Sequence, residues 1–144
     1  MRDGLRKNLP LENVVIDHVA VAVHDTADAL RLYVDTLGFE AEQTDVVPAE
    51  NIRVTFVNGR NARLEVIEPL TEDSAVGRFL AKRGEGIHHI CLEVVDLPSA
   101  LDRLRAAGYQ LVDDMPRQGF HGKLLAFVHP KSTNGVMIEL YERS

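Results

Sequence analysis

The sequence predicts an α+β fold in which two tandem β-α-β-β-β modules form a cupped mixed sheet with helices on its outer face. A repeat and a pattern of apolar alternation predict this fold. Residues 15–30 and 86–101 match around a histidine. Three matched pairs share an offset of 71 residues (89 − 18, 96 − 25, 101 − 30): His18 and His89, Asp25 and Asp96, Leu30 and Leu101. A repeat of this length indicates one structural unit used twice.

The first module begins with an alternating strand at residues 15–23, which places His18 and small alanines on one face and valines on the other. Asp25 or Thr26 can cap a helix whose apolar residues, Leu37 included, recur at helical spacing up to Gly38. Three more strands are predicted, at about 39–46, 52–57 and 62–68. The Asn58-Gly59 pair favours a turn between the last two.

The second module repeats this plan after a linker that contains a short helix near Ser74–Lys82. A strand at 87–95 leads to a helix with Pro98 in its first turn and Gly108 at its end. Strands follow near 109–114, 123–128 and 135–142. We expect residues 1–13 to be a flexible leader and residues 14–142 to be a single domain. Within it, we expect modules at about 14–70 and 86–142 and a linker at 71–85.

The composition excludes several classes of protein. The chain of 144 residues is 45% hydrophobic and 26% charged, which is typical of a globular protein. A net charge of −6 and the lack of Lys/Arg runs argue against a nucleic-acid partner. No stretch is long and apolar enough to enter a membrane. Cys91, the single cysteine, excludes internal disulfides and fits the cytoplasm.

Four residues are candidate metal ligands. Each module offers a histidine on its first strand, His18 or His89, and a glutamate among aliphatic residues on its last strand, Glu65 or Glu139. A lone strand histidine is more often a hydrogen-bonded core residue, but the two-fold match of both residue types favours a metal site. Two imidazoles and two carboxylates suit a divalent ion such as Co²⁺, Ni²⁺, Mn²⁺, Fe²⁺ or Zn²⁺. Four ligands on a six-coordinate ion leave two positions for a chelating substrate.

The remaining histidines have other predicted roles. His88 faces away from His89 by strand alternation, which predicts packing or a hydrogen bond behind the ligand. His24 and His129 lie at strand ends or in loops and are expected at the surface. His121 stays open as a ligand contact, because the loop 117–122 is rich in glycine.

At this point the chain resembles a known family, the vicinal oxygen chelate superfamily, which includes glyoxalase I, extradiol dioxygenases and metal-free antibiotic-binding proteins. Within it, the chain is most similar to the methylmalonyl-CoA epimerases. Four stretches carry the resemblance: Ile16–Val23, Leu64–Leu70, Phe79–Ile90 and Ala126–Leu140. The resemblance implies the glyoxalase fold and an epimerase that removes the α-proton of methylmalonyl-CoA through a metal-stabilised enolate. It also implies metal ligands at His18, Glu65, His89 and Glu139, and a cytoplasmic homodimer that binds an acyl-CoA.

The resemblance also raises the question of which groups move the proton. Some epimerases of this group carry a glutamate on the second strand of the first half, where this chain has Val54. Glu139 is then the candidate base on one face of the substrate, and Glu50 is the nearest carboxylate for the other. Arg117, His121 and Lys131 are candidate substrate contacts. Co²⁺ is the expected ion, with Mn²⁺, Ni²⁺ or Zn²⁺ as alternatives.

Two other functions remain open from the sequence. A glyoxalase-I-type lactoylglutathione lyase, or another enzyme of this superfamily, uses the same ligand types. A metal-free module that binds a small molecule has the same fold but does not need four matched ligands.

Overall fold

The computed structural model describes residues 10–119 and 122–143. The chain divides into two compact units. Residues 18–89 form the N-terminal unit, and the described residues of segments 10–17 and 90–143 form the C-terminal unit. The boundaries fall inside two strands, β1 (Val15–Ala22) and β6 (Gly86–Val94). His18 and His89 are therefore the first and last residues of the N-terminal unit.

The N-terminal unit contains a mixed sheet of strands in the order β2-β4-β5-β1, with β3 also pairing with β4. Parallel pairing joins β1 to β5, whereas β4 runs antiparallel to β5, β2 and β3. The other strands of this unit are β2 (Glu40–Ala41), β3 (Asp45–Val47), β4 (Ile52–Asn58) and β5 (Arg63–Pro69). A 3-10 turn, η2 (Pro48–Glu50), connects β3 to β4.

The C-terminal unit repeats this arrangement with the order β6-β9-β8-β7. Here β6 is parallel to β9, and β8 is antiparallel to β9 and β7. The strands are β7 (Arg117–Gln118), β8 (Leu124–Val128) and β9 (Ile138–Glu142), and a 3-10 turn, η4 (Pro130–Ser132), precedes β9. The two predicted β-α-β-β-β modules are therefore confirmed.

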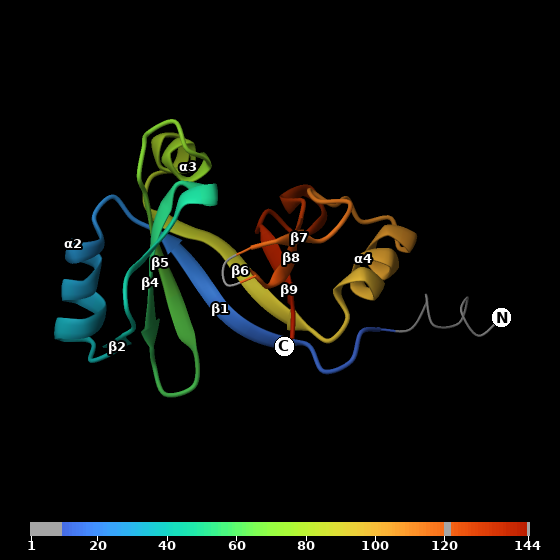
Figure 1. Cartoon of the computed structure of the whole chain (residues 1–144), viewed down its shortest axis with the longest axis horizontal. Helices are drawn as coiled ribbons and strands as arrows, with labels where there is room; N and C mark the ends of the chain where they lie inside the picture. The colour runs from blue at the N-terminus through green and yellow to red at the C-terminus, as the bar shows by residue number, and fades with distance from the viewer. Residues whose placement is uncertain (1–9, 120–121, 144) are drawn as a thin grey trace. The chain divides into compact units, whose positions relative to one another are not determined.

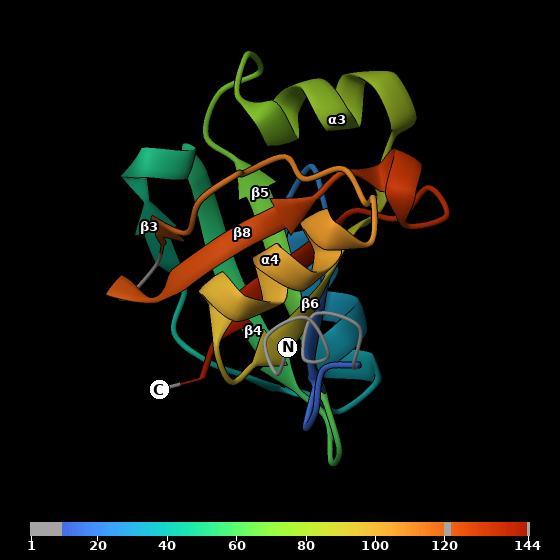
Figure 2. The same cartoon turned by 90° about the vertical axis from the view of Figure 1, so that its right-hand side faces the viewer.

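One helix covers the same face of the sheet in each unit. Helix α2 (Thr26–Leu30) and the π-helical segment η1 (Arg31–Thr36) pack on Val23, Val57 and Val66. Helix α4 (Leu97–Ala106) packs on the equivalent strands through Leu97, Ala100 and Leu101. Figure 1 shows α2 beside β4 and β5, and in Figure 2 α4 lies across β8.

Both helices begin with the same pair of acidic groups. The side chain of Asp25 accepts a hydrogen bond from the amide of Asp28, as the sequence predicted, and Asp96 does the same for Ser99. A glutamate on the last strand of each unit adds a second acceptor: Glu68 for the amide of Thr26 and Glu142 for that of Leu97. Such caps satisfy amides that the first helical turn leaves open.

Helix α3 (Ala75–Arg83) packs on the other face of the N-terminal sheet. Its residues Val76 and Leu80 join a buried cluster with Ile52, Val54 and Ile67. Because strand neighbours alternate between faces, this cluster lies on the side opposite to Val57 and Val66. Side chains on the same face of β1 include Ala20 and Ala22, so α3 covers part of the face that carries His18.

Three local predictions were wrong. The segment expected as one strand at 39–46 forms two short strands, and 109–114 contributes a single bridge between Leu111 and Val128. Leu37, expected on the buried side of the first helix, is 55% exposed. A π-helix holds more residues per turn than an α-helix, so the π segment rotates Leu37 away from the sheet. No helix in the described part of the chain has the length and apolarity needed to span a bilayer.

Candidate metal centre

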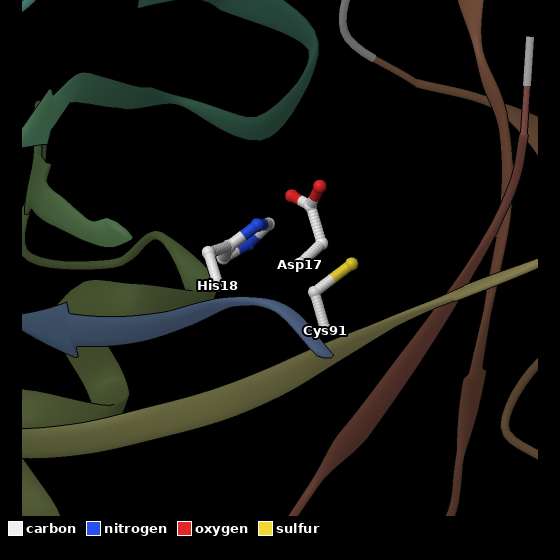
Figure 3. A group of neighbouring side chains, drawn as sticks. All are labelled: Asp17, His18 and Cys91. Carbon is white, nitrogen blue, oxygen red and sulfur yellow. The ribbon is translucent and has the colours of Figure 1, made fainter. Parts of the chain in front are cut away.

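The two repeated histidines occupy buried positions in the N-terminal unit. His18 lies on β1 and His89 on β6, and each is only 5% exposed. Their rings meet edge to face with centroids 5.6 Å apart. Figure 3 shows His18 extending from β1, next to Asp17 in the chain. Two imidazoles brought together in a buried place, as the sequence predicted, need a common polar partner.

That partner is Glu65 on β5. Its Oε1 atom is 3.5 Å from the Nε2 atom of His18 and 3.5 Å from the Nε2 atom of His89, and its side chain is 15% exposed. Both distances exceed the normal range for a nitrogen–oxygen hydrogen bond. Donor atoms that each lie about 2.1 Å from one ion are separated by roughly 3.0–3.4 Å at tetrahedral or octahedral angles. The distance from the Oε1 atom of Glu65 to each imidazole nitrogen is therefore close to that between two ligands of one divalent cation.

Strand register explains why these residues converge. Ala20 pairs with Glu65 across β1 and β5, and His18 is two residues before Ala20, so the imidazole and the carboxylate share one face. Phe56 pairs with Glu65 across β4 and β5, and its ring contacts that of His18 with centroids 5.2 Å apart. The guanidinium of Arg63 covers the Phe56 ring at 4.0 Å. An aromatic side chain thus borders the site.

The same register occurs in the C-terminal unit. Glu139 pairs with Cys91 across β6 and β9 and with Phe127 across β8 and β9. Cys91 follows His89 by two residues, as Ala20 follows His18. Phe127 is the repeat partner of Phe56, and Glu139 is half-buried. Each unit therefore places its strand glutamate between an aromatic residue and a small residue of the first strand.

The other described residues predicted to act as a base or to contact the substrate lie on three different elements. Glu50 ends η2 and is half-buried. Arg117 lies on β7, where it pairs with Asp113 at 3.4 Å and covers the ring of Phe127 at 5.4 Å. Lys131 is exposed on η4. His121 lies outside the described residues.

A family model described as Glyoxalase/Bleomycin resistance protein/Dioxygenase superfamily matches residues 17–127. The chain belongs to this superfamily. It is 41% identical over 127 residues to the ethylmalonyl-CoA/methylmalonyl-CoA epimerase of Cereibacter sphaeroides. That match covers 87% of this chain and 95% of the relative. The superfamily assignment confirms the fold that the sequence predicted.

Solved structures of this superfamily agree with that assignment. The methylmalonyl-CoA epimerase of Mycobacterium tuberculosis has a TM-score of 0.83 at 34% identity, over 96% of this chain and 95% of that one. A methylmalonyl-CoA epimerase variant of Streptomyces coelicolor, in complex with 2-nitronate-propionyl-CoA, has a TM-score of 0.82 at 36% identity. That match covers 90% of this chain and 94% of the other.

Sequence reasoning missed a polar network in the C-terminal unit of this superfamily member. The hydroxyl of Tyr141 donates to Asp17 at 3.2 Å, and the ammonium of Lys123 lies 3.4 Å from that hydroxyl and 4.6 Å from the ring centroid. Tyr141 follows Glu139 by two residues and so shares its face of β9. That alternation was the available signal, and it assigns Tyr141 to the same side of β9 as the candidate ligand Glu139.

Proposed function

We propose that the protein is a methylmalonyl-CoA epimerase, which interconverts the (2R) and (2S) forms of its substrate by removing and replacing the α-proton. Relatives with this activity match the chain almost end to end. The observation that carries the proposal is the approach of one Glu65 oxygen to the Nε2 atoms of two buried histidines, His18 and His89. A lyase of the same superfamily would use similar ligands, so the substrate itself must be tested.

We propose Glu139 as the fourth ligand, beside His18, Glu65 and His89. Its support is the repeated register, since Glu139 has the same position relative to Cys91 that Glu65 has relative to Ala20. Two neutral imidazoles and two carboxylates balance the charge of a divalent ion, and we propose Co²⁺, with Mn²⁺, Ni²⁺ or Zn²⁺ as alternatives. When bound, such an ion supplies electrostatic stabilisation of the enolate oxygen, worth several kcal/mol.

The proton transfers need groups on both faces of the planar enolate. We propose that Glu139 serves one face. Val54 is 4% exposed and packs in the cluster under α3. Its aliphatic side chain offers neither an acid nor a base at this position. Glu50 is proposed for the other face because it ends the turn just before β4.

The acyl-CoA substrate carries phosphates and a carboxylate, which need cationic partners. We propose Arg117, His121 and Lys131 as these contacts. Arg117 has a partner already in Asp113, which would orient its guanidinium rather than leave it mobile. A single domain spanning residues 14–142, a homodimer and a cytoplasmic location complete the proposal. The single cysteine of the chain, Cys91, is buried, and a chain with one cysteine suits a reducing compartment.

The test is to incubate the protein with Co²⁺ and (2R)-methylmalonyl-CoA in deuterated water. We expect the (2S) form to appear together with deuterium at the α-carbon, and the His89→Ala variant to lose both signals. The His24→Ala variant changes an exposed histidine of the same unit and should retain them. Turnover of a glutathione hemithioacetal without turnover of methylmalonyl-CoA would overturn the proposal in favour of the lyase.

A further inference from the structure

We infer that His88 is a positioning residue that fixes the tautomer of His89, and this inference rests on the metal site proposed above. The Nδ1 atoms of the two neighbouring rings are 2.8 Å apart, which is hydrogen-bond distance. Their ring centroids lie 5.1 Å apart with an interplanar angle of 80°. Strand alternation predicts that the two side chains point to opposite faces, but here the two rings meet at their Nδ1 atoms.

The direction of this hydrogen bond decides whether His89 can bind a cation. A neutral imidazole carries one N–H, so one Nδ1 atom donates and the other accepts. If His89 accepted, its proton would sit on Nε2 and block coordination there. The Nε2 atom of His89 lies 3.5 Å from Glu65, farther than an N–H donor normally sits from a carboxylate oxygen. The geometry thus favours His89 as the Nδ1–H donor, with a lone pair on Nε2.

Helix α3 holds the acceptor in place. The ring of Phe79 contacts His88 edge to face with centroids 4.9 Å apart, and Phe79 packs against the buried cluster that includes Val54 and Ile67. On the same helix, the guanidinium of Arg83 lies 5.8 Å from the ring centroid of Phe79. The linker helix therefore orients His88, and His88 orients the ligand.

An imidazole is an unusual acceptor in this position. Metal-binding histidines commonly donate their second N–H to a carboxylate, a backbone carbonyl or water, which orients the ring and makes it a stronger ligand. His88 provides the orientation without adding a negative charge. Because the proposed ligands already include two carboxylates, a neutral acceptor leaves the charge of the site balanced.

The first test needs no metal. Long-range proton–nitrogen NMR spectra of the metal-free protein report which ring nitrogen of His89 carries the proton. We expect the Nδ1–H form in the wild type and in His88→Asn, whose side-chain oxygen can accept the same bond. We expect a substantial Nε2–H population in His88→Leu. An Nε2–H form of His89 in the wild type would overturn the inference even if the protein proves to be an active epimerase.

The second test measures Co²⁺ binding by visible absorption and by competition with a chelator. We expect affinity to fall about 10–100-fold in His88→Leu, to stay within about threefold in His88→Asn, and to be unchanged in the control His24→Leu. Equal losses in both His88 variants, or wild-type affinity and spectrum in His88→Leu, would overturn the inference. Failure of the wild type to bind Co²⁺ would instead overturn the proposed metal site, and the NMR result would still decide the role of His88.

Discussion

At the scale of single residues, the site depends on one oxygen atom of Glu65 that faces two imidazoles. A lone carboxylate beside two neutral rings has little to stabilise its charge when it is buried. A divalent cation between these groups would satisfy all three at once. The charge on Glu65 should therefore contribute to metal affinity, beyond the contribution of its oxygen as a ligand.

Replacing Glu65 by glutamine tests this contribution. Glutamine keeps an oxygen donor of similar reach but removes the negative charge. We expect Glu65→Gln to weaken Co²⁺ binding at least about tenfold, or about 1.4 kcal/mol, without a change in folding. Competition with a chelator measures the affinity, and Glu72→Gln changes an exposed glutamate of the same unit as a control. Unchanged affinity would show that Glu65 is not a ligand.

The sequence could predict which residues belong to the candidate site wherever the repeat supplied a second residue of the same type at a matching position. His18, His89 and Glu65 were found because each type recurs at a matching place, and the structure brings these three together. For His88, alternation predicted packing or a hydrogen bond behind the ligand, but it did not predict that the Nδ1 atoms of His88 and His89 would meet directly. Tyr141 was accessible to the same alternation rule but had no chemical signal of its own.

At the scale of elements, the helix starts are held by long-range carboxylates. Glu68 accepts from both the amide and the hydroxyl of Thr26, at 2.8 and 2.7 Å, and pairs with Arg53 at 2.8 Å. The contact joins β4, β5 and α2 on the face away from the histidines. A cap supplied by another strand fixes where the helix begins and also where it sits on the sheet.

Removing this carboxylate should therefore destabilise the N-terminal unit. We expect Glu68→Ala to lower the free energy of unfolding by about 1–2 kcal/mol, because a cap and a partly buried ion pair are lost. Urea denaturation followed by circular dichroism measures the change. Co²⁺ affinity should stay near the wild-type value, since Glu68 lies on the opposite face from Glu65. A loss of stability equal to that of Glu72→Ala would contradict a capping role.

Helix and strand positions were predictable wherever a cap or an alternation was strong. Asp25, Ser74 and Pro98 were placed at, next to or in the first turn of the correct helices, and the first strand of each module was found within about one residue. The π segment was not predictable, because residue spacing of i, i+3 and i+4 fits an α-helix and carries no mark of a wider turn. The segment 109–114 has apolar residues but forms only the bridge at Leu111.

At the scale of the whole molecule, the proposed ligands come from strands that are distant in sequence. An ion that binds the folded chain and not the unfolded one adds RT ln(1 + [L]/Kd) to the stability. With the ion at about 100 times its Kd, this term is about 2.7 kcal/mol. For a chain of 144 residues, each kcal/mol raises the melting temperature by roughly 2–4 °C.

We therefore expect Co²⁺ to raise the melting temperature by about 5–10 °C and a chelator to reverse the increase. Differential scanning fluorimetry measures the shift. In Glu139→Gln the shift should shrink if Glu139 is the fourth ligand, whereas Glu93→Gln, a change on the neighbouring strand β6, should leave it intact. An undiminished shift in Glu139→Gln would remove Glu139 from the proposed ligand set.

The spacing of two glutamates on each last strand has a consequence for how the chain tolerates change. Glu65 and Glu68 are three residues apart on β5, as Glu139 and Glu142 are on β9, so the members of each pair point to opposite faces. A shift of the strand register by one residue would turn Glu68 and Glu142 away from the helices that they cap. It would also turn Glu65 and Glu139 toward those helices. Insertions within β5 or β9 should therefore be rejected during evolution, whereas the loops before them can vary in length.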